Sequence, residues 1–469
     1  MTPVPKKDAL RMIPSVDEVL AAAEIAALRA RYANFPWTAC VRQIIGRFRA
    51  GELGQSGATR DEVKETIIAG VGVRLDELKN GGLGVVINAT GVILHTNLGR
   101  SVFGERAREA ADEAMANYVD LEIDLDSGQR SGRGGTLNEL VAMATGAEAA
   151  VVVNNNAAAV YLVVNSFSPP GRVVISRGEL VEIGGSFRLP DILERAASEM
   201  IEVGTTNRTY IDDYAKVARK GDILMRAHRS NYDIQGFTHD TTVGDLVALA
   251  RERECHVVYD LGSGSLFDFS AIGIEGEERV ADVLGAGVDC VTMSGDKLIG
   301  GPQAGIIVGS ADLIARLRQN PLRRAVRIDK VVIAAMQSVM RSYLFAEEPA
   351  RDIPMLSMAI EPADKLRSRA EAIVGRLPDA VRKKLRAEVV DDDSAVGGGS
   401  FAVASVPSVA IALHCDDDHA ASRLARRLRV GEIPILSRIK GAEVRLNLRT
   451  VLANQDELLV NQLEAALRS

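Results

Sequence analysis

The chain has 469 residues, of which 47% are hydrophobic and 25% charged, so it can bury a large core and is expected to form two or three domains. Its net charge of -7 argues against a protein whose whole surface binds nucleic acid, although a local basic patch remains compatible with it. No apolar run approaches the ~18 residues of a membrane helix, and the start, MTPVPKKDALRMIPS, lacks the apolar stretch of a signal peptide. We therefore expect a cytosolic protein without a membrane partner.

The cysteines indicate free thiols rather than a disulfide framework or a zinc site, because they lie far apart and form no CxxC pair. They are Cys40, Cys255, Cys290 and Cys415. No metal is expected.

Residues 1–80 are expected to form a helical domain. Ser15 and Glu18 have the spacing of a capping box, and helix formers continue to about Leu78, where NGGLG ends the segment. Within residues 1–60, nine lysines and arginines stand against five acids. This excess suits contact with nucleic-acid phosphates, and it equally suits the solvated face of a helix.

From Val85 to Lys330, short β-branched runs alternate with helical stretches and glycine-rich turns. This alternation predicts an α/β domain over residues 81–330, with a mostly parallel sheet covered by helices on both faces and functional groups at the strand ends. Residues 331–469 are expected to form a smaller α+β domain. Within it, the glycine-rich stretch VGGGSFAVAS, residues 396–405, is expected to be a loop.

Three polar features follow apolar strands in the predicted sheet. Asp260 ends the strand in HVVYDLGSGS, and Lys297 follows the strand in CVTMSGDKLIGGPQAG. Neighbouring strand ends would bring both into one cleft, although Asp260 could instead cap a turn and Lys297 could be a solvated turn residue. In VVVNNNAAAVYLVV, Asn154, Asn155 and Asn156 precede small residues that open a helix, a pattern suited to holding an anion.

An anion cradle, a strand-end aspartate and a strand-end lysine follow in the order expected of a pyridoxal-phosphate-dependent transferase fold of the aspartate aminotransferase type (fold type I). The cradle would hold the cofactor phosphate, and Ser294 could add a hydrogen bond to it. Asp260 would stabilise a protonated pyridine nitrogen, and the amine of Lys297 would bond to the cofactor aldehyde. The cradle lacks a Walker motif, and a nicotinamide site is weakly supported, because the sequence contains no full GxGxxG setting.

The sequence resembles those of the bacterial selenocysteine synthases, the L-seryl-tRNA(Sec) selenium transferases. The strings that carry the resemblance are INATGVILHTNLGRS (87–101), TGAEAAVVVNNNAAAV (145–160), RGELVEIGGSFRLPDI (177–192), VGTTNRT (203–209), SNYDIQGF (230–237), SGDKLIGGPQAGII (294–307) and NPLRRAVRIDK (320–330). They stand in the family's order, and the resemblance extends from IPSVDEVL to the C-terminal domain. One departure is SGQRSGRGGTLNEL, residues 127–140, where a GxRGSR-like string is expected; Arg130 and Arg133 keep the basic charge.

The resemblance implies conversion of L-seryl-tRNA(Sec) to L-selenocysteinyl-tRNA(Sec) with selenophosphate, through a dehydroalanyl intermediate bound to pyridoxal 5'-phosphate. It implies that Lys297 carries the cofactor and acts as the base at Cα, that Asp260 pairs with the pyridine nitrogen, and that Asp296 has a supporting catalytic role. A turn acid is the alternative for Asp296.

The resemblance also assigns the selenophosphate group to three arginines, Arg100, Arg324 and Arg327. Guanidinium groups suit such a ligand because they bind oxyanions bidentately and stay charged. The family further implies a homo-oligomer, a ring-shaped decamer built from dimers, in which the amino-terminal helical unit holds the tRNA.

Two other functions remain open. A related pyridoxal phosphate lyase acting on a small amino acid or a phosphorylated amino sugar acid would share the lysine, the aspartate and the cradle, but it would have no use for residues 1–80. A catalytically silent assembly or RNA-binding protein could retain the fold. The roles of four further residues also stay open, namely His95, Arg177, Glu182 and His228.

Overall fold

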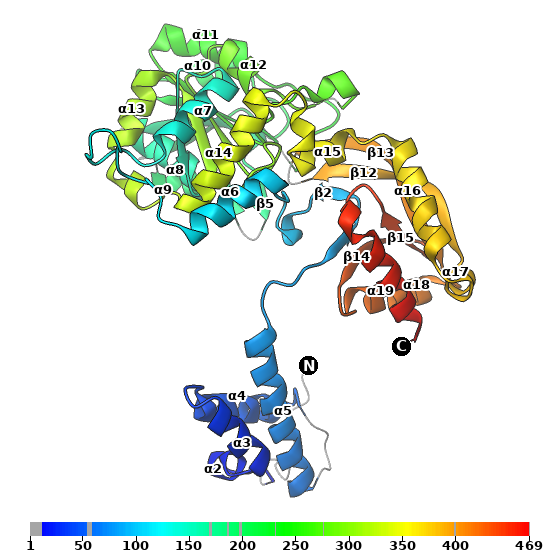
Figure 1. Cartoon of the computed structure of the whole chain (residues 1–469). Coiled ribbons are helices and arrows are strands. Elements are labelled where there is room, and N and C mark those ends of the chain that lie inside the picture. Colours follow the sequence, from blue (N-terminus) through cyan, green and yellow to red (C-terminus); the bar gives the residue numbers. More distant parts are fainter. Residues whose placement is uncertain are drawn as a thin grey trace. The chain divides into compact units, whose positions relative to one another are not determined.

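The computed structural model separates the chain into two compact units, Met1–Val85 and Val86–Ser469 (Figure 1). The residues that it describes are 12–53, 59–167, 171–184, 187–196, 199–229, 231–274, 276–397 and 400–468. Among these residues, no helix is long and apolar enough to cross a membrane.

The amino-terminal unit is helical, as the sequence predicts for its described part. Its helices are α2 (Val16–Leu20), α3 (Ala23–Arg31), α4 (Trp37–Arg49) and α5 (Arg60–Asn80). The predicted capping box is present, since Ser15 Oγ accepts from the backbone of Glu18 at 3.2 Å and the Glu18 carboxylate accepts from the backbone of Ser15. Val41, Ile44 and Ile67 are fully buried between the helices. Three of the predicted basic residues, Lys6, Lys7 and Arg11, lie outside the described part.

The larger sheet of the second unit has seven strands in the order β3-β11-β10-β9-β8-β4-β7. They are β3 (Ala149–Val153), β4 (Arg172–Ser176), β7 (Glu199–Val203), β8 (Ile223–Ala227), β9 (His256–Gly262), β10 (Cys290–Ser294) and β11 (Gly305–Gly309). β11 runs antiparallel to both its neighbours, and the other pairings are parallel. The predicted mostly parallel sheet is therefore confirmed.

Helices cover both faces of this sheet and enclose a separate apolar cluster on each. On one face lie α6 (Glu105–Ala116), α7 (Gly135–Thr145), α11 (Val243–Arg253), α12 (Val280–Gly285) and α14 (Lys330–Phe345). On the other lie α8 (Asn156–Phe167), α9 (Leu189–Ala196) and α13 (Ala311–Gln319). The strands between them are buried on both faces, which explains their continuous apolar runs.

The second sheet has six strands in the order β1-β14-β15-β13-β12-β2. They are β1 (Ile87–Ala89), β2 (Val92–Leu94), β12 (Ala387–Gly397), β13 (Ser400–His414), β14 (Ile435–Lys440) and β15 (Glu443–Asn447). Helices α16 (Ala363–Arg376), α18 (Asp418–Arg429) and α19 (Asp456–Arg468) contribute to its core.

Three features of this part differ from the predictions. Residues 87–94 were expected in the large domain, but they form β1 and β2 of the second sheet. Helix α14 was expected in the small domain, but it packs against α6 and α7 beside the larger sheet. The predicted loop at residues 396–405 is wrong where it can be checked, because β12 extends to Gly397 and β13 begins at Ser400; Gly398 and Gly399 lie outside the described residues.

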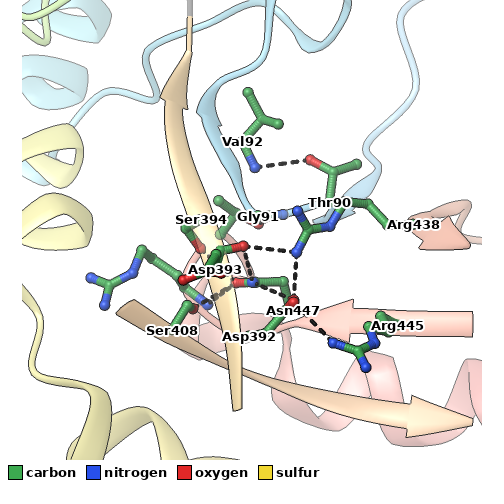
Figure 2. Close-up of polar contacts among 12 residues, drawn as sticks. Thr90, Gly91, Val92, Asp392, Asp393, Ser394, Ser408, Arg438, Arg445 and Asn447 are labelled. Atoms are coloured by element: carbon green, nitrogen blue, oxygen red, sulfur yellow. Dashed lines mark hydrogen bonds and ion pairs between the residues drawn. The ribbon is translucent and has the colours of Figure 1, made fainter. Parts of the chain in front are cut away.

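Asn447 is the centre of a buried polar network in the second sheet (Figure 2). Its Nδ2 donates to Asp392 Oδ2 at 2.9 Å, and its Oδ1 accepts from the hydroxyls of Ser394 and Ser408 at 3.0 and 2.9 Å. Arg438 and Arg445 pair with the Asp392 carboxylate. The contacts join strands β12, β13, β14 and β15, so this network, called the Asn447 network below, stabilises their register.

The bend between β1 and β2 packs directly on Asn447. Gly91 has φ +75°, and a Cβ there would lie 2.8 Å from Cγ of Asn447, so glycine is required on both counts. The backbone N–H of Gly91 donates to Thr450 Oγ1 at 3.0 Å, and its carbonyl accepts from Ala395. β2 then leads directly to the segment that contains His95 and Arg100.

Candidate active site

Lys297 lies in a turn after β10, and its side chain is only 3% exposed. The turn is closed by backbone hydrogen bonds from Gly295 to Ala304, 2.8 Å, and from Gly301 to Gly295, 2.9 Å. Gly300 has φ +76°, and a Cβ there would lie 2.4 Å from Ile353. This glycine-rich stretch therefore folds tightly enough to hold an amine inside the protein instead of in solvent.

The Lys297 side chain lines a cavity of about 530 Å³. Most of the predicted site residues also line it, which brings together groups that lie up to 197 positions apart in the sequence. They are Arg100, Asn155, Asn156, Asp260, Ser294 and Asp296. Further lining residues that the prediction did not assign are Thr96, Asn97, His228 and Gln303.

Asn154 is the exception among the three asparagines. Its side chain is exposed and does not line the cavity, while its backbone N–H donates to Val326 O at 2.8 Å. Asn155 Oδ1 accepts from the backbone N–H of Ala158 at 2.8 Å and so caps α8, as its position predicts. Asn156 points instead to the sheet. Only the second and third asparagines are therefore placed to hold a ligand.

Asp260 is buried where β8, β9 and β10 meet. Its Oδ1 accepts from Asn156 Nδ2 at 2.8 Å and from Thr292 Oγ1 at 2.9 Å. Burial raises the pKa of this carboxyl, against the opposing effects of these hydrogen bonds and of the Lys297 charge. A cationic N–H donor placed against Asp260 would therefore be bound strongly.

The Lys297 amine has a lowered pKa, first because it is buried and second because Arg100 is near; Asp260 and Asp296 oppose the shift. Arg100 Nη1 pairs with Asp296 Oδ2 at 2.8 Å. The Ser101 hydroxyl donates to the backbone carbonyls of Asp296 and Lys297 at 3.0 and 3.1 Å. A larger fraction of the amine is thus neutral, which is the form that acts as a nucleophile or base.

The residues present fit pyridoxal 5'-phosphate. Several buried polar atoms at this site have no hydrogen-bond partner within the described structure, namely Asn156 Oδ1, His228 Nδ1 and Arg100 Nε. Asn155, Ser294 and the start of α8 would hold the phosphate, Asp260 the pyridine nitrogen and Lys297 the aldehyde carbon. When bound, the cofactor would supply an electron sink for bond cleavage at Cα of an amino acid.

Arg324 and Arg327 line a different cavity, of about 430 Å³. The three arginines predicted to share one selenophosphate are therefore divided within a single chain, with Arg100 beside Lys297 and the other two elsewhere. Arg130 and Arg133, from the segment with the altered motif, also line this second cavity, and both pair with Glu122.

The four residues without assigned roles differ in their surroundings. His228 lines the Lys297 cavity, and its backbone N–H donates to the carbonyl of Asp260 at 2.9 Å. His95 has a buried Nδ1 without a partner in the described part, but it does not line the cavity. Arg177 pairs with Glu202, and Glu182 with Arg188, both near the surface.

Sequence reasoning missed two residues that support the site. Thr292 could have been found, since it alternates with Ser294 along β10 and lies opposite Asp260 in the register. Glu179 gave no such signal. Its carboxylate accepts from the backbone of Ala227 at 3.1 Å, next to His228, and burial raises its pKa to about 7 despite the nearby charge of Arg226.

Comparison with known families agrees with this arrangement. The family model described as "L-seryl-tRNA selenium transferase" matches residues 86–452, and the one described as "Selenocysteine synthase N terminal" matches residues 10–49. The chain belongs to the L-seryl-tRNA selenium transferase family. The predicted family is thereby confirmed. Enzymes of this family depend on pyridoxal phosphate, in agreement with the fit of the Lys297 cavity.

Relatives in this family match nearly the whole chain. The L-seryl-tRNA(Sec) selenium transferase of Moorella thermoacetica is 41% identical over 463 residues, which cover 98% of this chain and 97% of the relative. That of Geobacter sulfurreducens is 39% identical over 452 residues, covering 96% and 98%.

A solved structure of D-glucosaminate-6-phosphate ammonia-lyase has a TM-score of 0.60 at 19% identity, covering 84% of this chain and 98% of its own. At this identity the likeness concerns the fold alone. It agrees with the predicted pyridoxal-phosphate-dependent transferase fold.

Proposed function

We propose that this protein converts L-seryl-tRNA(Sec) to L-selenocysteinyl-tRNA(Sec), with selenophosphate as the selenium donor. The observation that carries the proposal is the buried Lys297 side chain, which lines the same cavity as Asp260, a cavity that fits pyridoxal phosphate, in a chain of this family. The lyase alternative loses support because the family match includes the amino-terminal unit, for which a small-molecule lyase has no use.

Four residues of the cavity are assigned a task in this reaction. The neutral amine of Lys297 takes the proton from Cα of the seryl group, and the resulting ammonium can give it to the β-hydroxyl, which leaves as water. Asp260 balances the positive charge on the pyridine nitrogen. Asp296 holds Arg100 by their 2.8 Å ion pair, so that the guanidinium faces the cavity and can orient the incoming anion.

The direct test is to supply the purified holoenzyme with seryl-tRNA(Sec) and selenophosphate and to identify the aminoacyl product by mass. Selenocysteinyl-tRNA is the expected product. Release of free pyruvate or ammonia from serine, with no selenium in the product, would support a lyase instead.

Selenophosphate binding by all three arginines requires more than one chain. Arg324 and Arg327 lie in a different cavity from Arg100, so a second subunit would have to bring its own pair to Lys297 of the first. This requirement agrees with the homo-oligomer, a decamer built from dimers, that the family resemblance implies.

Subunit complementation tests this arrangement. Lys297→Ala and Arg324→Ala should each inactivate the homo-oligomer. Co-assembled subunits should recover part of the activity, because some sites receive a native residue from each chain. No recovery in mixed oligomers of verified composition would place all the groups of one site in one chain.

The amino-terminal unit is proposed to hold the tRNA, and the cytoplasm, where aminoacylated tRNA is used, is the proposed location. Deletion of residues 1–80 should abolish tRNA binding and leave the visible absorbance of the bound cofactor unchanged. An unchanged tRNA affinity of the truncated protein would assign recognition to the second unit.

A further inference from the structure

Glu122 binds three arginines at the edge of the second cavity. It lies in a short hairpin, in which the backbone N–H of Ser131 donates to the carbonyl of Glu122 at 3.0 Å. Its Oε2 accepts from Arg130 at 2.8 Å, and its Oε1 accepts from Arg133 at 2.9 Å and from Arg327 at 3.3 Å. One carboxylate therefore serves three guanidinium groups.

These three contacts are not equivalent. Arg133 is held twice, since it also donates to the backbone carbonyl of Ile328 at 3.0 Å, and its side chain is only 20% exposed. Arg327 makes the longest contact and is 38% exposed. It is also one of the two arginines of this cavity proposed to contact selenophosphate. Arg327 thus makes the weakest of the three contacts by distance, whereas Arg130, although 73% exposed, is held at 2.8 Å.

The cavity as a whole carries excess positive charge. Glu122 is the one carboxylate among its described lining residues, against six arginines, Arg130, Arg133, Arg318, Arg323, Arg324 and Arg327. Burial and the neighbouring charge of Arg318 lower the pKa of Arg323, as expected for cations held close together. Within the described part of the chain, the Arg324 side chain has no hydrogen-bond acceptor. Such a cluster favours an anion with several oxygens.

We propose that Glu122 competes with the anionic ligand for Arg327 and thereby sets which anions this cavity accepts. The inference rests on the proposed function, in which Arg327 contacts selenophosphate. A phosphate-type anion offers several oxygens and can replace the carboxylate on Arg327 with a bidentate pair, whereas chloride cannot. Glu122 therefore weakens the binding of every anion but excludes weakly coordinating ones most strongly.

The test is calorimetric titration of the holoenzyme with inorganic phosphate at low ionic strength. Glu122→Gln keeps the size of the side chain and removes its charge, so phosphate should bind about threefold more tightly, the range expected for losing one partly exposed ion-pair competitor. The gain should shrink in 0.5 M sodium chloride because of screening. A purely structural role of Glu122 would give looser binding, not tighter.

Two control variants and one alternative substitution complete the phosphate titration. Glu139→Gln on α7 makes the same charge change at an exposed carboxylate outside this cavity and should leave phosphate affinity unchanged. Arg327→Gln should weaken phosphate binding. If Glu122→Gln lowers the melting temperature, Glu122→Asp is used in its place. The shorter carboxylate withdraws from Arg327 and should give a smaller gain in phosphate affinity.

The outcomes separate the inference from the proposed function. If Arg327→Gln weakens phosphate binding while neither Glu122 variant strengthens it, the competition is overturned and Arg327 keeps its role as an anion ligand. If Arg327→Gln has no effect either, the proposed selenophosphate contact of Arg327 fails as well.

Discussion

Two asparagines, the fully buried Asn447 and the half-buried Asn156, show the difference between a structural polar cluster and the proposed active site. Asn447 uses both atoms of its amide, donating to Asp392 and accepting from two serine hydroxyls. Asn156 donates to Asp260, but its buried Oδ1 has no partner in the described part of the chain. Because native proteins rarely leave buried polar atoms unpaired, the free Oδ1 leaves Asn156 able to accept a hydrogen bond from a ligand, whereas Asn447 uses both of its amide atoms.

The two aspartates beside these asparagines differ in the same way. Burial alone would raise the pKa of Asp392, but the hydrogen bond from Asn447 and the charge of Arg438 hold it below its usual value. At Asp260 burial prevails, and the pKa is raised. The Asn447 network therefore stabilises its own carboxylate, whereas the Lys297 cavity leaves Asp260 without a paired cation among the described residues, a place that a protonated pyridine nitrogen would fill.

The largest expected effect is that of Lys297→Ala, which removes the amine from the Lys297 cavity. Selenium transfer should fall by a factor on the order of 10³ or more, since both the cofactor linkage and the proton transfer are lost. The visible absorbance that borohydride abolishes in the native protein should be absent. Lys440→Ala, at an exposed lysine of β14, is the control and should behave like the native protein. If Lys297→Ala kept the native rate of selenium transfer, the Lys297 cavity would not be the active site.

Replacing each of the two asparagines by alanine provides the second test. Asn447→Ala should lower the free energy of unfolding by about 3 kcal/mol, because Ser394, Ser408 and Asp392 all lose a buried partner. Asn156→Ala should change stability less and reduce the affinity for pyridoxal phosphate more. Urea unfolding and cofactor titration measure the two effects. Equal stability losses in both variants would contradict the distinction.

Glu179 allows the comparison to be tested as a function of pH, because its carboxyl is partly buried and its pKa is raised to about 7. Between the unfolded pKa, near 4.5, and 7, the folded state keeps a proton that the unfolded state has lost. Stability should therefore fall as the pH rises through this window, by up to about 3 kcal/mol, and level off above it.

Glu179→Gln should remove much of this pH dependence, measured as the melting temperature between pH 4.5 and 8. Asp392→Asn, at the carboxyl with a lowered pKa, is the matched comparison and should lose stability mainly above its unfolded pKa. A Glu179→Gln variant with the native pH profile would show that this carboxyl titrates normally.

The smallest effect is expected at Asn154, whose side chain is exposed and outside the cavity. Asn154→Ala should leave cofactor affinity within about twofold of the native value, since surface substitutions usually change little. Asn155→Ala should weaken it, because the α8 cap that lines the cavity is removed. Cofactor titration of both variants decides which asparagines form the cradle.

The local features of this protein could be predicted from the sequence. Apolar runs predicted the buried strands β9 and β10, and the polar residue that ends each run predicted Asp260 and the Lys297 turn. The spacing of Ser15 and Glu18 predicted a helix start that the structure contains. These inferences succeeded because strand burial, capping and tight turns depend on neighbouring residues.

The tertiary structure alone decided the long-range partners. Strand pairing placed residues 87–94 in the second sheet, and the direction of α8 decided that Asn154 faces away from the cavity while Asn156 reaches Asp260. Packing also assigned Arg100 and Arg327 to different cavities and brought Glu122 to the latter. Hydrophobic periodicity specifies which face of an element is buried but not which distant element covers it, so these contacts required the folded chain.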